Sequence, residues 1–253
     1  MRTVIPLKSQ NDLEILREAG RILAGIMQKL EGRVNPGIST AEIDSLAEKL
    51  IREAGCKSAF KGYKGYPAAV CISLNEEVVH GIPGPRILTD KDIISLDVGI
   101  EYQGYFSDVA VTLALGRIEP RTKKLIEVAK KALSEGIKQA AVNNHLFDIS
   151  YAVQEYVEEN GFSVVRDFVG HGIGRELHEE PEIPNFGQPH RGAILRSGMV
   201  LAIEPMVNMG TWETRILDNG WTAVTKDGLP SAHFEHTIAV TDEGPEILTR
   251  LNG

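Results

Sequence analysis

The sequence predicts an α+β fold with helices outside one central sheet, and two observations carry this prediction. An order of helix, helix, glycine, loop and strands occurs twice, over about residues 12–115 and again over about 120–240. Apolar residues recur at helical spacing early in each half and alternate with polar residues late in it. Two such halves pack as one sheet-centred unit. We therefore expect a single domain over residues 1–253, with an active site between its halves.

The first half contains two predicted helices and a strand. Residues 12–31 form the first helix, because Leu13, Leu16, Leu23, Met27 and Leu30 recur at helical spacing. Ser39 and Glu42 form a capping box for the second helix, which Gly55 ends. The glycine-aromatic loop AFKGYKGYP leads to a strand over residues 69–74, and residues 75–84, with His80, are predicted to be a loop.

The second half repeats this order with different residues. Pro120 opens a long helix, Asp148 is predicted to cap another, and Gly161 ends it. A glycine-rich loop is expected over residues 169–178. Strands are then predicted over residues 199–206, about 221–225, and 234–240.

Composition and charge exclude several protein classes. The chain is 42% hydrophobic and 25% charged, as in ordinary globular proteins. Its net charge of −8 argues against a general nucleic-acid groove. No run approaches the roughly 18–20 apolar residues of a membrane span, and the N-terminus has no apolar signal core. Cys56 and Cys71 form neither a disulfide framework nor a CxxC motif, so we expect a reducing, cytoplasmic setting.

The stretch ISLDVGIEYQGYFSDVAV, residues 94–111, predicts a hairpin that places two aspartates among packing residues. With a turn at residues 102–104 and pairing symmetric about Tyr102 and Gln103, Asp97 and Asp108 face each other. Their Cβ atoms would then be about 4.5–5.5 Å apart. Like charges at that distance need a cation between them, and one or two divalent metals suit the oxygen ligands. Two solvated aspartates on a strand edge remain the alternative.

Other polar residues fall on or beside apolar strands. Glu204, in VLAIEPM, is either metal-bound or part of a structural salt bridge, because charged residues are rarely buried unpaired. Glu235 lies on a strand that could face solvent. His171 and His178 lie in FVGHGIGRELHEEP, where a structural role is the alternative to ligation. The remaining expectations are a buried, non-nucleophilic Cys71 and a surface or hydrogen-bonded position for four histidines, His145, His190, His233 and His236.

Six short motifs give this chain a resemblance to a known protein family. They are HGIP at 80–83, the Asp97 and Asp108 pair, GHGIG at 170–174, HEEP at 178–181, IEPM at 203–206 and FEHT at 234–237. Their order, and the upstream text REAGRI, NPGIST, GYKGYP and VCISLNEEVVHGIP, resembles the methionine aminopeptidases over about residues 12–240. The form resembles type I, because only a short stretch separates His178 from Glu204. Without a zinc-finger extension at its N-terminus, it looks bacterial in type.

This resemblance implies the pita-bread fold, with two pseudo-symmetric helix–helix–strand halves around a curved antiparallel sheet and a central dinuclear metal site. Two divalent ions, of Co, Mn, Fe, Zn or Ni, would be the cofactors. The resemblance implies five ligands, Asp97, Asp108, His171, Glu204 and Glu235, of which Asp108 and Glu235 would bridge both ions. It also implies a pocket for the methionine thioether, lined by Tyr63, Tyr66, Cys71, Leu177 and Trp221. Leu177 departs from the family, which often has an aromatic residue there.

The implied reaction removes the N-terminal methionine of peptides and nascent chains, with a preference for a small second residue. Water activated between the ions would attack the first peptide carbonyl. His178 would donate to the developing oxyanion, Glu204 would carry a proton to the leaving nitrogen, and His80 would position the peptide. The expected partners are peptide N-termini and, transiently, the ribosome, with no nucleic-acid motif, no membrane contact and a monomeric state.

Three alternatives stay open. An Xaa-Pro aminopeptidase or prolidase shares the five ligands but typically carries a separate N-terminal domain, whereas this chain begins about a dozen residues before the first shared helix. A non-catalytic pita-bread binding protein would be expected to have lost metal ligands. A metal-dependent phosphatase would need cationic groups near the carboxylates, and the sequence offers no evident candidates.

Overall fold

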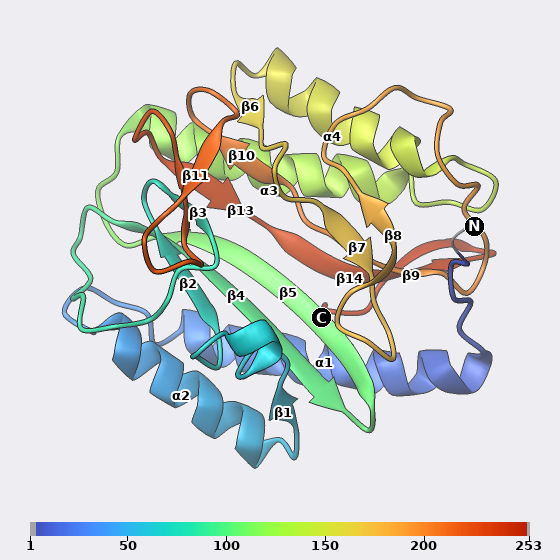
Figure 1. The fold of residues 1–253 in the computed structure, drawn as a ribbon, viewed down its shortest axis with the longest axis horizontal. Helices are drawn as coiled ribbons and strands as arrows, with labels where there is room; N and C mark the ends of the chain where they lie inside the picture. Colours follow the sequence, from blue (N-terminus) through green and yellow to red (C-terminus); the bar gives the residue numbers. More distant parts are fainter. Residues whose placement is uncertain (1–3, 252–253) are drawn as a thin grey trace.

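A curved antiparallel sheet runs through the middle of the molecule (Figure 1). The computed structural model describes residues 4–251, so the ends of the predicted unit, residues 1–3 and 252–253, lie outside the described residues. The main sheet has the order β1 (Lys57–Ser58), β4 (Ile93–Tyr102), β5 (Tyr105–Ala114), β14 (Glu235–Thr241), β9 (Val200–Ile203), β7 (Gly170–Gly172) and β8 (Glu179–Ile183). At its sides, β2 (Cys71–Leu74) pairs with β4, and β15 (Gly244–Ile247) pairs with β14.

Two smaller sheets flank the main one. The first contains β13 (Ser231–His233), β10 (Met206–Asn208) and β6 (Ser163–Val164). The second contains β11 (Thr214–Ile216), β12 (Ala223–Thr225) and β3 (Glu77–Val79). A short 3-10 turn at Tyr63–Gly65 lies in the glycine-aromatic loop.

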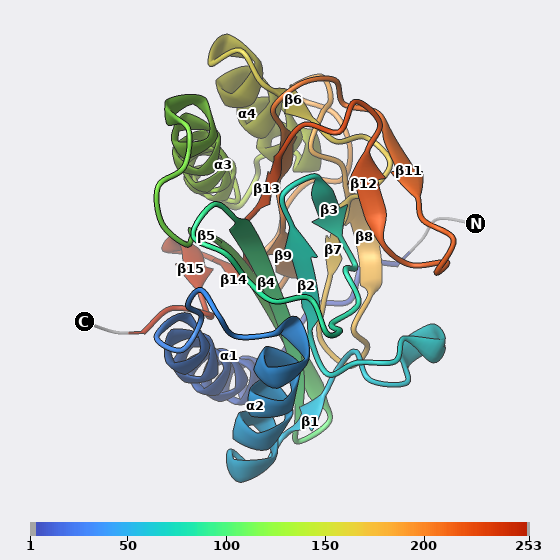
Figure 2. The same cartoon turned by 90° about the vertical axis from the view of Figure 1, so that its left-hand side faces the viewer.

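Four helices cover the outer side of the sheet in two pairs (Figures 1 and 2). The pair α1 (Gln10–Glu31) and α2 (Thr40–Glu53) packs on β2 and β4 through residues such as Leu23, Ile43 and Leu96. The pair α3 (Pro120–Lys138) and α4 (Leu146–Glu159) packs on β9 and β14 through residues such as Val153 and Leu201. The predicted α+β class is therefore confirmed. Within residues 4–251, no helix combines the length and apolar character needed to cross a membrane.

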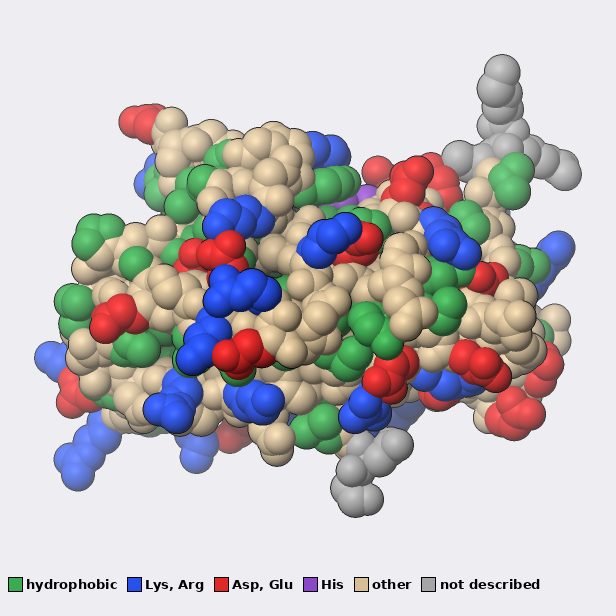
Figure 3. All heavy atoms as spheres, turned by 90° about the horizontal axis from the view of Figure 1, so that it is seen from below, with side chains coloured by type: hydrophobic (Ala, Val, Ile, Leu, Met, Phe, Trp, Pro, Cys, Tyr) green, Lys and Arg blue, Asp and Glu red, His purple; other side chains and the backbone are tan. Residues whose placement is uncertain are grey.

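The solvent-exposed surface carries both basic and acidic side chains. On the face seen in Figure 3, basic and acidic side chains are interspersed. Ion pairs within one helix, such as Arg21 with Glu18 and Lys49 with Glu53, are exposed to solvent. Exposed pairs of this kind stabilise a fold only slightly, so the buried faces of the helices provide the packing energy.

The helix ends follow local capping chemistry. The predicted box at α2 is confirmed, because Ser39 Oγ accepts the Glu42 N–H at 3.2 Å and Glu42 Oε2 accepts the Ser39 N–H at 2.9 Å. Helix α1 begins earlier than predicted, because Ser9 and Asp12 form a second capping box. Asp148 caps α4 as predicted, but from the third residue of a capping box rather than from the N-cap position. His145 occupies that position, and Asp148, three residues later, accepts its N–H.

Two predicted loops contain strands instead. β3 lies within residues 75–84, and β7 lies within the glycine-rich segment 169–178. β7 needs its glycines because a Cβ at Gly172 would lie 2.1 Å from the carbonyl oxygen of Glu180. The predicted strand 199–206 is instead two strands, β9 and β10, separated by Glu204 and Pro205. Proline lacks the N–H that a continuous ladder requires.

The hairpin of β4 and β5 has a different register from the one predicted. Its turn residues, Gln103 and Gly104, have φ of 51° and 77°, as in a two-residue type I′ turn. The pairing is therefore centred between these two residues, and Asp97 pairs with Ala110. Asp108 lies two positions from Ala110. The two aspartates are thus diagonal neighbours on one face of the sheet rather than directly opposed.

Candidate metal centre and substrate pocket

The predicted site residues surround one cavity of about 200 Å³. Strands carry four of the proposed ligands: Asp97 on β4, Asp108 on β5, His171 on β7 and Glu235 on β14. Glu204 follows the end of β9, at the break before Pro205. The seven other predicted residues also line the cavity: Tyr63, Tyr66, Cys71, His80, Leu177, His178 and Trp221.

Two further lining residues, Phe60 and Lys64, were missed by the sequence reading. Both lie in the glycine-aromatic loop AFKGYKGYP, whose composition was the available signal. Lys64 Nζ lies 5.3 Å from the centroid of the Tyr63 ring, so this loop brings a cation to one wall of the cavity.

Four carboxylates share the buried floor of the cavity. Burial, followed by the charge of Asp108, raises the pKa of Asp97 well above its ordinary value. Burial likewise raises the pKa of Asp108 to about 7 and raises those of Glu204 and Glu235. Asp97 Oδ1 and Glu235 Oε1 are buried without a hydrogen-bond partner. Buried acceptors in this state are costly, and a cation would satisfy them.

His171 presents a lone pair to this floor. Its Nδ1 lies 2.9 Å from the carbonyl oxygen of Gly172, and its Nε2 lies 3.4 Å from Oε1 of Glu204. Burial lowers the pKa of His171 to about 4, so the imidazole is neutral near pH 7. A neutral ring that donates from Nδ1 to a carbonyl has only an acceptor at Nε2. Nε2 and the Glu204 oxygen therefore face each other across 3.4 Å, where either a proton on Glu204, whose pKa burial raises, or a bound cation would join them.

The donor set fits divalent metal ions. One ligand atom from each of Asp108, His171 and Glu235 lies within 4.8 Å of the other two. Carboxylates with one imidazole suit Mn, Fe, Co, Zn and related ions. Within the described residues, only the neutral rings of His171 and His233 lie within ion-pair distance of the four carboxylates, so no lysine or arginine there neutralises them.

Aromatic residues and neutral histidines form the opposite side of the cavity. The Tyr63 hydroxyl lies 2.8 Å from His178 Nδ1, and the two rings stack with centroids 5.2 Å apart. Burial, followed by the charge of His171, lowers the pKa of His178 to about 3. Burial also lowers the pKa of His80, which packs edge-on against Trp221.

The apolar end of the cavity is fixed by hydrogen bonds to backbone. Tyr66 donates its hydroxyl to the carbonyl of Gly81 at 2.7 Å and packs edge-on against Trp221 at 5.2 Å. Cys71, on β2, is buried as predicted, and that burial raises the pKa of its thiol.

His233 corrects one expectation. It was predicted to be at the surface or hydrogen-bonded, but its ring is buried and Nε2 has no hydrogen-bond partner. Nε2 lies 3.6 Å from Oε2 of Glu204, on the carboxylate oxygen that His171 does not face. Its position two residues before Glu235 was the available signal. His236 agrees with the expectation, since its Nδ1 lies 2.9 Å from the Thr249 hydroxyl.

Comparison with known proteins agrees with this geometry. Residues 14–242 match metallopeptidase family M24. A methionine aminopeptidase from Clostridium perfringens is 52% identical over 248 residues, which cover 98% of this chain and 100% of the relative. The crystal structure of a methionine aminopeptidase from Thermotoga maritima is 45% identical with a TM-score of 0.96, covering 98% of this chain and 100% of that one.

A prolidase from Pyrococcus furiosus shares the fold. It is 21% identical with a TM-score of 0.78, and the match covers 98% of this chain and 66% of the prolidase. This likeness concerns the fold alone. Together with the Thermotoga maritima structure, it confirms the predicted pita-bread architecture.

Proposed function

Because the chain belongs to metallopeptidase family M24, we propose that the cavity is its active site. The chain is a metal-dependent aminopeptidase that removes N-terminal methionine, in agreement with near full-length relatives. One observation above all supports placing the reaction here. The lone pair of neutral His171 faces a buried carboxylate, an arrangement that a bound cation would stabilise.

The proposed metal centre holds two divalent ions through Asp97, Asp108, His171, Glu204 and Glu235. Mn, Fe, Co, Zn and Ni are all compatible with these ligands. When bound, such ions lower the pKa of water and polarise a substrate carbonyl. Four of these residues lie on strands of the one main sheet, whose pairing fixes their positions.

The protein's own groups complete the reaction. A Tyr63 hydroxyl that donates to Nδ1 of His178 leaves the proton of the neutral ring on Nε2. That N–H is then a donor for the oxyanion that develops on the first carbonyl. Glu204 accepts a proton from the attacking water and delivers it to the leaving nitrogen. His80 positions the peptide beside the scissile bond.

Selectivity for methionine would come from the apolar end of the cavity, which contains Tyr63, Tyr66, Cys71, Leu177 and Trp221. A thioether is flexible and polarisable and makes favourable contacts with aromatic rings. The limited volume of about 200 Å³ also favours a small second residue. Leu177 provides an aliphatic wall in place of an aromatic ring.

The cellular setting is part of the same proposal. Substrates would be nascent chains and peptides in the cytoplasm, met through transient contact with ribosomes. The enzyme would act as a monomer, with residues 1–253 as one catalytic domain of two pseudo-symmetric halves.

Hydrolysis of Met-Gly-Met tests the proposed function. Chelator-stripped protein should release methionine only after addition of Mn²⁺ or Co²⁺, and an Asp97→Ala variant should release none under the same conditions. Cleavage of an Xaa-Pro dipeptide in preference to Met-Gly-Met would instead assign the site to a prolidase-like enzyme. Failure to cleave either peptide with any metal would contradict the proposed active site.

A further inference from the structure

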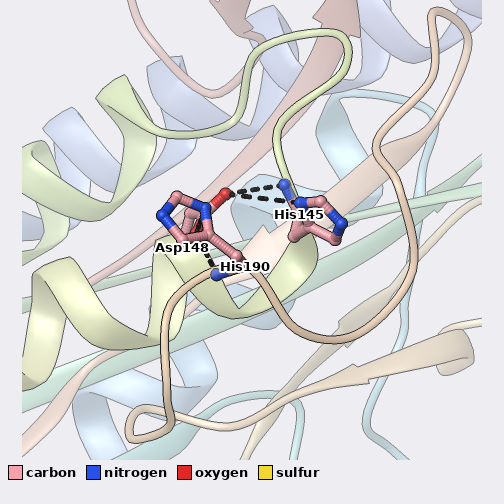
Figure 4. A group of neighbouring side chains, drawn as sticks. All are labelled: His145, Asp148 and His190. Carbon is pink, nitrogen blue, oxygen red and sulfur yellow. Dashed lines mark hydrogen bonds and ion pairs between the residues drawn. The ribbon is translucent and has the colours of Figure 1, made fainter.

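Two histidines and an aspartate meet on the surface of the second half of the molecule (Figure 4). His145 is the N-cap of α4, Asp148 lies in the first turn of that helix, and His190 lies in the connection between β8 and β9. None of the three lines the catalytic cavity. One ligand atom from each lies within 4.8 Å of the other two.

Asp148 organises this group through the backbone. Its Oδ2 accepts the N–H of His145 and its Oδ1 accepts the N–H of His190, each at 2.7 Å. A carboxylate has about four lone-pair sites, so each oxygen keeps one for another partner. Although burial raises it, the pKa of Asp148 is lowered overall by these two N–H groups, which keeps the carboxylate charged.

The connection that carries His190 is tied to the start of α4. The N–H of Phe147 donates to the carbonyl of Arg191 at 3.1 Å, and the N–H of Leu146 donates to that of Ala193 at 2.8 Å. The backbones that carry both imidazoles are therefore held beside one carboxylate by main-chain hydrogen bonds. A site fixed in this way loses little conformational entropy when a ligand binds.

The separations suit a metal better than hydrogen bonds. The Nδ1 atoms of His145 and His190 lie 4.0 and 3.5 Å from the nearest Asp148 oxygens. These distances are too long for hydrogen bonds. Around a tetrahedral zinc ion with bonds of about 2.0–2.1 Å, ligand atoms are about 3.3 Å apart. Small rotations of the two rings, whose side chains are 33% and 83% exposed, would reach this spacing.

We propose that His145, Asp148 and His190 form a separate binding site for a borderline divalent cation such as Zn²⁺. Two imidazoles and a carboxylate are a typical zinc donor set, and water would take the fourth position. The positive end of the α4 dipole opposes a cation here, so this ion binds less tightly than those of the catalytic cavity. Its binding fastens the β8–β9 connection to α4.

Zinc titration of stripped protein, followed by equilibrium dialysis and metal analysis, tests this site. The variants are His190→Asn alone and combined with His145→Asn. Asparagine tolerates the positive φ of 60° at residue 190 and is a favoured N-cap at residue 145. Gln188→Ala, an exposed change in the same connection, is the matched control. Ions of the catalytic cavity are common to all four proteins and cancel in the comparison.

Wild-type protein and Gln188→Ala should each bind one more zinc equivalent than the double variant. His190→Asn alone should weaken this last equivalent at least tenfold. Zinc should also slow amide exchange of residues 184–192 in the wild type but not in the double variant. Equal zinc stoichiometry and affinity in all four proteins would overturn the proposal, as would retention of the extra equivalent after both histidines are replaced.

Discussion

The Nε2 atom of His171 lies 3.4 Å from Oε1 of Glu204, and the proton of this neutral imidazole is on the opposite nitrogen, toward Gly172. Two acceptors at this distance repel unless a proton or a metal ion lies between them, and a bound metal ion replaces the proton that the raised pKa of Glu204 otherwise favours. The pair comes from β7 and from the end of β9, so sheet pairing holds the two atoms in place.

Replacing His171 should therefore remove metal rather than unfold the protein. We expect His171→Ala to lower metal-dependent methionine release by at least about 100-fold, since the proposed metal centre loses its only imidazole ligand. Metal content after dialysis should fall in parallel. His190→Asn, which lies outside the cavity, is the control for activity only, since it removes an imidazole from the separate surface site and should keep full methionine release. Normal metal content and activity in His171→Ala would contradict the ligand role.

The hydrogen bond between Tyr63 and His178 should affect turnover rather than substrate binding. Tyr63→Phe keeps the stacked ring but removes the hydroxyl that, in the proposed role, donates to Nδ1 and so leaves the proton of His178 on Nε2. We expect the kcat of Tyr63→Phe to fall about tenfold with little change in KM, and the kcat of His178→Ala to fall by about 10²–10³. Metal content should stay normal in both variants. A rise in KM without a fall in kcat would assign both residues to binding instead.

The raised pKa of Asp108 predicts that the stability of the metal-free protein depends on pH. Burial raises this pKa from 3.8 to about 7, so the folded state binds a proton that the unfolded state has lost. The associated stability is present below about pH 4 and is lost as the pH rises through about 7. Buried histidines with lowered pKa values make the free energy of unfolding change with pH in the opposite direction. The effect of Asp108 must therefore be isolated by comparison with Asp108→Asn.

Urea unfolding of both stripped proteins between pH 4 and pH 8 measures this effect. Relative to Asp108→Asn, the wild type should lose stability as the pH rises, on the order of a few kcal/mol. Added divalent metal should reverse the trend in the wild type alone. A difference that does not change with pH would show that Asp108 is charged in the stripped fold.

Replacing a glycine by alanine should have opposite effects on stability at two positions. A Cβ at Gly172 would lie 2.1 Å from the Glu180 carbonyl oxygen, so Gly172→Ala should force β7 and β8 apart. We expect a loss of about 1–3 kcal/mol in the free energy of unfolding. A Cβ at Gly25, on α1, would have no neighbouring atom within 4 Å, so Gly25→Ala should stabilise by up to about 1 kcal/mol. Thermal unfolding of both variants checks the contrast, and equal shifts would contradict it.

Much of the local structure could be predicted from the sequence. The helices follow from apolar spacing, and the box of Ser39 with Glu42 caps α2 as its residue types require. Glu204 stood out because a carboxylate inside an apolar strand needs a partner. The capping box at Ser9 and the N-cap position of His145 were equally local, but the flanking residues gave weaker signals.

Pairing between segments was harder to predict. The positive φ at both Gln103 and Gly104 moves the centre of the hairpin by one position, which makes Asp97 and Asp108 diagonal rather than opposed. Glycines in residues 170–172 suggested a loop, yet they allow β7 to lie close between β8 and β9.

By itself the sequence determined the chemical types available to this protein, the amphipathic helices, and the order of the motifs, because these depend on neighbouring residues. Only the tertiary structure decided which groups meet. His233 approaches Glu204 from another strand, and His190 reaches Asp148 from a distant connection. Such contacts depend on strand register and on how far each backbone can approach another. Both are set by packing across the whole molecule rather than by local preference.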